Sequence, residues 1–209
     1  MIITGIEPRK KGLSEIYIDG EFAVKLDTKT ILENRVKVGA DIDDEQLHFL
    51  IQQSDLQRAK DKALWLISYR DHSSRELEDK ISRTCNREAA KGAVERMEEL
   101  GLINDENFAR RYASQLYENK KLAKSAVIYK LCLKGIDKET ASQIAEELEP
   151  ESDSQIYAVI EKKYKNALND EKGRKRAVAG LQRMGYRYGD IKRVLNEFCD
   201  EQEFPAEEF

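Results

Sequence analysis

The chain has 209 residues, of which 40% are apolar, 36% are charged and three are proline, and its formal net charge is −4. This composition predicts a soluble, helix-rich protein with a thin core and a large solvated surface. No apolar run approaches the ~18 residues of a membrane-spanning helix, and the first residues lack the features of a signal peptide. We therefore expect a cytoplasmic protein with no membrane partner.

The cysteines and histidines argue against a metal centre. Cys85, Cys132 and Cys199 are odd in number and far apart, and neither His48 nor His72 has a partner at helical spacing. We expect no zinc site and no disulfide framework. The motifs of nucleotide-binding loops, serine hydrolases and zinc proteases are also missing from the sequence. The sequence therefore predicts a non-enzymatic protein with no catalytic residue, metal or cofactor.

Residues 1–53 are expected to form a small β-rich extension with short helices. Apolar and polar residues alternate at Ser14–Asp19, and the pair Asp19-Gly20 favours a tight turn. A short helical segment is expected at Thr28–Asn34, followed by a helix that Asp43 caps. A sheet this small needs a covering helix to be stable. The expected strands are Ile2–Glu7, Ser14–Asp19 and Phe22–Leu26.

From residue 54 onward the apolar pattern is helical. Ser73-x-x-Glu76 is a capping box that begins a helix, Gly101 marks a helix end, and Asp137 marks another beginning. Connections of two to six residues join the helices, as in compact helical units. We expect three units of three helices and a disordered acidic tail, at residues 54–103, 104–151, 152–200 and 201–209.

These three units repeat at a constant offset of about fifty residues. Repeats of such a period indicate supersecondary units that bury their apolar faces against their neighbours. The fold class is therefore mainly α, with three tandem three-helix repeats in a curved, elongated array after the small β-rich extension. The equivalent positions are Ile81, Leu131 and Leu181; then Cys85, Gly135 and Gly185; then Val94, Ile144 and Val194.

Charge is segregated along the chain although the net charge is negative. The segment Glu106–Lys134 has a net charge of +5 and the segment Arg174–Arg193 has a net charge of +6. The tail from Glu197 carries six acidic residues and no basic one. Local fields of one sign matter more than net charge for binding a polyanion. The two basic segments are therefore the candidate binding regions.

Eleven basic residues in these segments are candidates for contact with a partner or with nucleic acid. The alternative is that they form ordinary solvated helix faces, which is the default for lysine and arginine. The candidates are Arg110, Arg111, Lys120, Lys121, Lys124, Lys130, Lys134, Arg174, Arg176, Arg183 and Arg187.

Aromatic residues divide into two expected groups. Tyr186 and Tyr188 flank Arg187 in a turn, so we expect both of them to be exposed and available for stacking. Leu64 and Trp65 belong to an apolar helical stripe that we expect to face the core.

Three motifs resemble the RecX family, whose members regulate the RecA recombinase. Residues 66–77, Leu-Ile-Ser-Tyr-Arg-Asp-His-Ser-Ser-Arg-Glu-Leu, are similar to the Leu-Ser-Tyr-Arg and Ser-x-x-Glu-Leu motif of its first repeat. Residues 100–112 resemble its Leu-Gly-Leu-Ile-Asp-Asp-x-x-Phe-Ala-x-x-Tyr junction, and residues 130–136 resemble its Lys-Gly-Ile ending. Two positions depart from the family pattern: Cys85 replaces a glycine, and residues 120–124 replace a basic, Gly/Pro-containing helix entry.

This resemblance implies a specific partner and mode of action. A RecX-like protein is expected to be a monomer that binds in the helical groove of the RecA–single-stranded DNA filament. There it modulates, and in most members inhibits, the recombinase, ATPase and co-protease activities. The alternative function is a direct nucleic-acid-binding module of helix-turn-helix type, and weak direct DNA binding is compatible with either.

Overall fold

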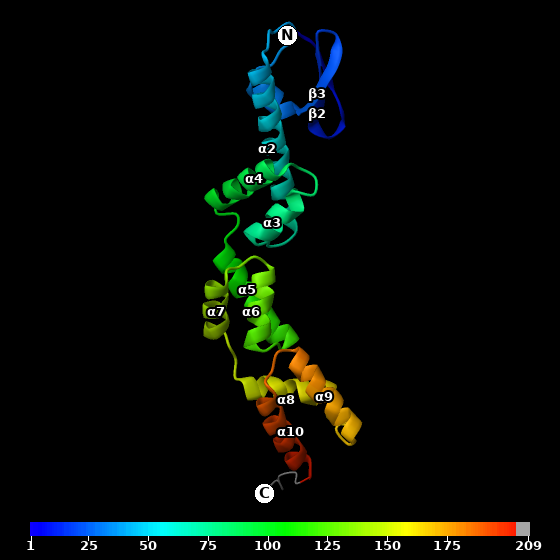
Figure 1. The fold of residues 1–209 in the computed structure, drawn as a ribbon, viewed down its shortest axis with the longest axis vertical. Helices are drawn as coiled ribbons and strands as arrows, with labels where there is room; N and C mark the ends of the chain where they lie inside the picture. The colour runs from blue at the N-terminus through cyan, green and yellow to red at the C-terminus, as the bar shows by residue number, and fades with distance from the viewer. Residues whose placement is uncertain (204–209) are drawn as a thin grey trace. The chain divides into compact units, whose positions relative to one another are not determined.

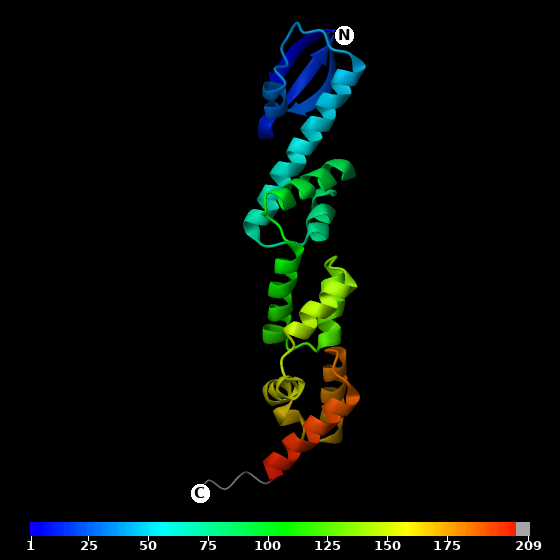
Figure 2. The same cartoon turned by 90° about the vertical axis from the view of Figure 1, so that its left-hand side faces the viewer.

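The computed structural model describes residues 1–203, and the chain divides into two compact units. The first unit comprises Met1–Asn104 and the second begins at Asp105 (Figure 1). The fold class is confirmed, because a small sheet at the N-terminus is followed by helices (Figure 2). Each unit has its own buried apolar clusters, so each is described by itself.

The N-terminal extension is a three-stranded antiparallel sheet in the order β1-β2-β3. The strands β1 (Ile3–Pro8), β2 (Leu13–Ile18) and β3 (Glu21–Asp27) lie where the sequence predicts them. Asp19 and Gly20 both have positive φ, 49° and 86°, as the tight turn between β2 and β3 requires.

Two helices cover this sheet, and the second also belongs to the first repeat. Helix α1 (Thr28–Glu33) begins at its cap Asp27, and α2 (Asp44–Tyr69) begins at a capping box formed by Asp43 and Gln46. The Asp27 amide donates to the hydroxyl of Ser54 at 2.7 Å and so ties β3 to the middle of α2. The residues buried between the sheet and its helices are Ile3, Ile16, Ile18, Leu26, Ile31, Ile42 and Leu50.

The expected boundary between residues 53 and 54 is wrong, because it lies inside α2. No proline or glycine interrupts residues 44–69, so the backbone hydrogen-bond ladder continues through the boundary. Leu50 packs in the core of the extension, whereas Ala59 and Ala63, further along α2, pack in the core of the first repeat. One helix therefore supplies both cores.

The first repeat consists of the second half of α2 with α3 (Ser74–Ile81) and α4 (Arg87–Glu99). Ser73 caps α3 by accepting from the Glu76 amide, as the sequence predicts. Leu64 and Trp65, by contrast, are 46% and 51% exposed, so their expected place in the core is wrong. The apolar stripe of α2 is wider than the surface that its neighbours cover, and small Ala59 and Ala63 form the actual contact.

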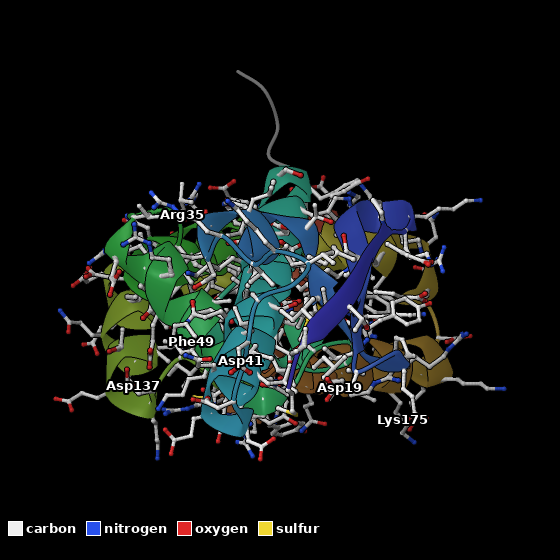
Figure 3. All side chains as sticks on the ribbon, turned by 90° about the horizontal axis from the view of Figure 1, so that it is seen from above. Asp19, Arg35, Asp41, Phe49, Asp137 and Lys175 are labelled. Atoms are coloured by element: carbon white, nitrogen blue, oxygen red, sulfur yellow. The ribbon has the colours of Figure 1, made fainter. Side chains whose placement is uncertain are left out.

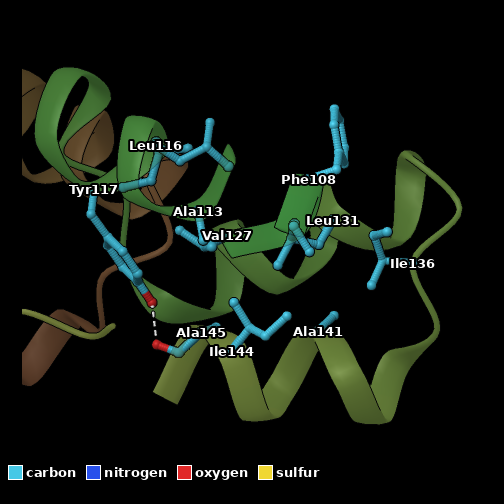
Figure 4. Close-up of a cluster of buried hydrophobic side chains, with 12 residues drawn as sticks. Phe108, Ala113, Leu116, Tyr117, Val127, Leu131, Ile136, Ala141, Ile144 and Ala145 are labelled. Atoms are coloured by element: carbon cyan, nitrogen blue, oxygen red, sulfur yellow. Dashed lines mark hydrogen bonds between the residues drawn. The ribbon is translucent and has the colours of Figure 1, made fainter. Parts of the chain in front are cut away.

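The second unit contains two more repeats of three helices. The second repeat is formed by α5 (Asp105–Lys120), α6 (Lys124–Leu133) and α7 (Lys138–Glu147). Figure 4 shows its core, where the Tyr117 hydroxyl donates to the Ala145 carbonyl at 2.7 Å. The third repeat is formed by α8 (Ser152–Lys163), a short 3₁₀ segment η2 (Lys165–Ala167), α9 (Glu171–Arg183) and α10 (Tyr188–Glu203).

The acidic tail begins later than the sequence predicts. The helix α10 continues to Glu203, three residues past the expected end of the third repeat. The rest of the predicted disordered tail, residues 204–209, lies outside the described residues.

The fifty-residue offset is confirmed at one set of equivalent positions, which we call the central column. Ile81, Leu131 and Leu181 lie on the middle helix of their repeats and are completely buried. After the second and third of these helices, Gly135 and Gly185 take φ of 92° and 95°, a left-handed conformation that favours glycine. At the equivalent position of the first repeat, Cys85 does not have a positive φ, because the turn that follows α3 is longer. The first repeat therefore does not need a glycine there.

Replacing a residue of this column should destabilise its own repeat. We expect Leu131→Ala to lower the free energy of unfolding by ~2–5 kcal/mol, because buried methyl groups are lost and a cavity remains. Chemical denaturation of the second unit's transition measures this cost. As a control, Leu133→Ala on the same helix removes an exposed side chain and should change the stability by less than ~0.5 kcal/mol. Equal effects of the two substitutions would contradict the repeat alignment.

Candidate interaction surface

The second and third repeats meet at a junction formed by the start of α6 and the turn before α10. The Ala123 amide donates to the Met184 carbonyl at 3.0 Å, and the Ser125 hydroxyl donates to the Gly185 carbonyl at 2.9 Å. These bonds join residues about sixty positions apart in the sequence. Backbone carbonyls of the turn therefore make direct hydrogen bonds across this junction.

Gly185 is required at this junction for two reasons. Its φ of +95° is a conformation that side chains disfavour, and a Cβ there would lie 2.8 Å from the Ser125 hydroxyl and 2.9 Å from the Ala126 Cβ. Contacts of a Cβ below about 3 Å are essentially forbidden by sterics. The backbone of the turn therefore lies directly against α6.

Tyr186 is buried in this junction, which makes its expected exposure wrong. Only 6% of its surface is exposed, and its hydroxyl donates to the Lys121 carbonyl at 2.8 Å. Burial raises the pKa of Tyr186 to about 12, so it stays a neutral donor at physiological pH. Tyr188 is 57% exposed, as the sequence predicts.

The Tyr186 hydrogen bond also fixes the loop that carries two of the candidate lysines. Lys121 has φ of 51°, which is uncommon for a residue other than glycine, and its carbonyl accepts the tyrosine proton. Lys120 ends α5 and is exposed. The third repeat thus holds the backbone from which these two lysines project.

A groove of about 460 Å³ lies along the same junction. It contains two of the candidate basic residues, Lys124 from the second repeat and Arg187 from the third, together with Glu149 and Asp190. Its remaining lining residues are Ala123, Ser125, Ile128, Ser152, Gly185 and Tyr186. The folded unit therefore brings together candidates from two segments that are far apart in the sequence.

Acidic residues at and just after the end of α7, together with Glu106 of α5, neutralise part of the basic segment of the second repeat. Lys124 pairs with Glu149 at 3.2 Å and with Glu146 at 3.5 Å, and its pKa is raised by the hydrogen bond to Glu149. Arg110 likewise pairs with Glu147 at 2.6 Å and with Glu106 at 3.1 Å. The net charge counted along residues 106–134 therefore overstates the positive field at this surface.

Seven of the candidates make no ion pair within the part of the chain that the structure describes, namely Lys120, Lys121, Lys130, Arg174, Arg176, Arg183 and Arg187. Arg174 and Arg183 donate to the backbone carbonyls of Leu168 and Ala179.

The other candidates do not line the groove. Arg111 donates to the Asn107 carbonyl on its own helix, and the Lys134 amine lies 5.8 Å from the centre of the Tyr112 ring at the far end of α6. Arg174 and Arg183 are nine residues apart on α9, which corresponds to about 14 Å along a helix axis. Lys124 and Arg187 line the groove, the Lys121 carbonyl contacts Tyr186, and Lys120 precedes Lys121. We call these four residues the junction surface.

Residues 1–203 contain neither a candidate membrane span nor a candidate metal site. No helix among them is both long and apolar enough to cross a membrane. No three histidine, cysteine, aspartate or glutamate side chains in this range are grouped in a way that could hold a metal ion.

A second hollow, of about 580 Å³, lies in the first unit beside the start of α2. Its lining includes Arg35, Asp41 and Phe49, which Figure 3 labels at the N-terminal end of the molecule. No motif in the sequence indicates this hollow, because its lining comes from three separate segments, namely the β1 strand, the loop at residues 34–42 and α2.

Comparison with known proteins identifies a consistent set of relatives. Residues 104–143 match the family model described as "RecX, second three-helix domain". The "Regulatory protein RecX" of Clostridioides difficile strain 630 is 26% identical over 208 residues, which cover 97% of this chain and 98% of that protein. The protein of the same name from Caldanaerobacter subterraneus subsp. tengcongensis is 27% identical over 199 residues, covering 94% and 99%.

A solved structure has the same fold. The "Crystal structure of regulatory protein RecX" aligns with a TM-score of 0.66 at 18% identity, covering 93% of this chain and 98% of that one. The sequence alignment with the Clostridioides difficile protein leaves out only 3% of this chain, so the similarity includes the β-rich extension. The three family motifs lie in a shorter range, between about residues 66 and 136.

The close approach at Gly185 should control the assembly of the junction. We expect Gly185→Ala to destabilise the second unit by ~1–3 kcal/mol, since the new methyl group forces α6 and the turn apart and the backbone is strained. Gly39→Ala is the matched control, because Gly39 has a similar φ of +86° but no atom within 4 Å of its added Cβ. Thermal denaturation of both variants measures the difference, and an equal loss would show that the φ angle alone matters.

Proposed function

We propose, because this chain belongs to the RecX family, that it is a non-enzymatic regulator which binds the RecA–single-stranded DNA filament and inhibits its activities. The observation that carries the proposal is similarity over nearly the whole chain to proteins named for a regulatory role. The activities affected would be the ATPase, recombinase and co-protease functions of the filament.

The junction surface is the part of the second unit best suited to this contact. A nucleoprotein filament is a polyanion, and cations fixed in position attract it without a further ordering cost. Lys120, Lys121 and Arg187 make no ion pair with the described residues, and the bond from Tyr186 to the Lys121 carbonyl holds the loop in one conformation. Lys124 is bound by two glutamates and is expected to contribute less.

A second candidate function is direct binding of nucleic acid by the three-helix units. It is favoured by Arg176 and Arg183, which lie seven residues apart on α9 and so share one exposed helix face. Such a module would lose affinity for naked single strands steeply with salt, with a logarithmic slope of about −0.7 for each phosphate contact. The binding of a filament regulator, by contrast, would depend on the presence of the recombinase on the DNA.

Paired charge reversals test the junction surface. Wild-type protein at stoichiometric concentration should lower the DNA-dependent ATPase of RecA. In Lys120→Glu/Lys121→Glu, half-inhibition should need about tenfold more protein, because two attractive charges become repulsive. Thermal denaturation should change little, since Lys120 is exposed, Lys121 is half-buried and neither makes an ion pair with a described residue.

The matched control is Lys10→Glu/Lys11→Glu in the first unit. These are also adjacent lysines without an ion pair in the described chain, and Lys11, like Lys121, has a positive φ, of 63°. The control should inhibit RecA like the wild type. Equal losses in both variants would indicate nonspecific electrostatics, and full inhibition by both would remove the junction surface from the mechanism.

A further inference from the structure

The solvent side of α2 carries two exposed aromatic rings next to two cations. Trp65 is 51% exposed and Tyr69 is 72% exposed, although tryptophan is mostly buried in folded proteins. Arg58, Lys62, Trp65 and Tyr69 are spaced by four, three and four residues, which places them in one row along the helix. We call this row the α2 stripe.

Three side chains of the stripe, Lys62, Trp65 and Tyr69, contact one another on the surface of α2. The rings of Trp65 and Tyr69 are 4.8 Å apart at an angle of 64°, and the Lys62 amine lies 4.0 Å from the centre of the Trp65 ring. The core contacts of this part of α2 are made instead by Ala59 and Ala63, with Leu66 and Ile67 at its edge. The rings are therefore held in place on the surface without being needed to fill the core.

The charge around the stripe favours an anionic partner. Between Arg58 and Arg70 there are four basic residues and one acidic residue, Asp61, in a chain whose net charge is negative. Lys60 and Lys62 make no ion pair with a described residue, whereas Arg58 contacts Asp55 at 3.6 Å and Arg70 pairs with Glu76. An apolar protein partner would leave these two lysines desolvated and unpaired, which is costly.

Exposed aromatic rings next to cations match the chemistry of an unpaired nucleic-acid strand. Nucleobases stack on tryptophan and tyrosine rings, and lysines attract the phosphates that link them. A duplex hides its base faces within its own stack, so rings on a helix surface have nothing to stack on there. The row along α2 offers two rings and two cations to consecutive parts of one strand.

We propose that the α2 stripe binds single-stranded nucleic acid directly, with Trp65 and Tyr69 stacking on bases and Arg58 and Lys62 contacting phosphates. This site lies in the first unit and needs no recombinase. The experiments on the α2 stripe therefore test it independently of the contact proposed for the junction surface.

Trp65 is the only tryptophan of the chain, so its fluorescence reports on this site alone. Titration of the full-length protein with oligothymidylate at low salt should quench the emission in a saturable way, and added salt should weaken the binding. A blunt duplex of the same length should quench at least tenfold less effectively. Oligouridylate is the parallel arm: equal quenching identifies any unpaired strand as the ligand, and quenching by oligothymidylate alone identifies DNA.

Variants separate stacking from nonspecific attraction. Tyr69→Leu and Lys62→Gln should each weaken the binding about fivefold or more, while Tyr69→Phe, which keeps the ring, should bind like the wild type. Tyr129→Leu is the matched control, because Tyr129 is 63% exposed on α6 in the second unit, outside the stripe. The binding of Trp65→Leu is followed by the fluorescence anisotropy of a labelled oligonucleotide and should be largely lost.

Three results would overturn the proposal. The first is an emission that oligothymidylate leaves unchanged, and the second is equal affinity for duplex and single strand. The third is quenching that occurs only when RecA is present, which would make the stripe a protein-contact surface.

Discussion

The contact between the Gly185 backbone and α6 is the constraint on which the second unit depends. A side chain at Gly185 does not fit between them, and the Met184 and Gly185 carbonyls of the turn accept hydrogen bonds directly from Ala123 and Ser125 at the start of α6. This contact brings Tyr186 under the loop at Lys121, and the hydroxyl of Tyr186 fixes that loop. A junction made by backbone approach tolerates less sliding than one made by flexible side chains.

Electrostatics at this surface follow from helix packing and not from charge counts along the chain. Helix α7 lies beside α5 and α6, and its end places Glu146, Glu147 and Glu149 next to Arg110 and Lys124. The Arg110 guanidinium lowers the pKa of Glu147, so this carboxylate stays charged under physiological conditions. The positive field therefore comes from the lysines and arginines that form no ion pair with Glu146, Glu147 or Glu149.

Much of the fold could be predicted because its signals are local. Burial of Ile81, Leu131 and Leu181 follows from a repeat in the sequence, and the caps Asp43, Ser73 and Asp137 are short-range hydrogen bonds.

The candidate site was less predictable, because it depends on contacts between distant segments. The burial of Tyr186 requires α6 to lie over it, and the neutralisation of Arg110 requires α7 to lie beside it. The exposure of Trp65 depends on how much of α2 its neighbours cover, which apolar periodicity does not measure. Sequence gives the period of a helix face but not the width of the surface that packs on it.

As a filament regulator, the chain is expected to bind the RecA–single-stranded DNA filament more tightly than either RecA or DNA alone. Binding to immobilised RecA–single-stranded DNA filaments, compared with binding to RecA alone and to protein-free single strands at physiological salt, tests it most directly. We expect a dissociation constant for the filament that is at least about tenfold lower than for either component, a difference of about 1.4 kcal/mol. Equal affinity for the filament and for naked DNA would contradict it.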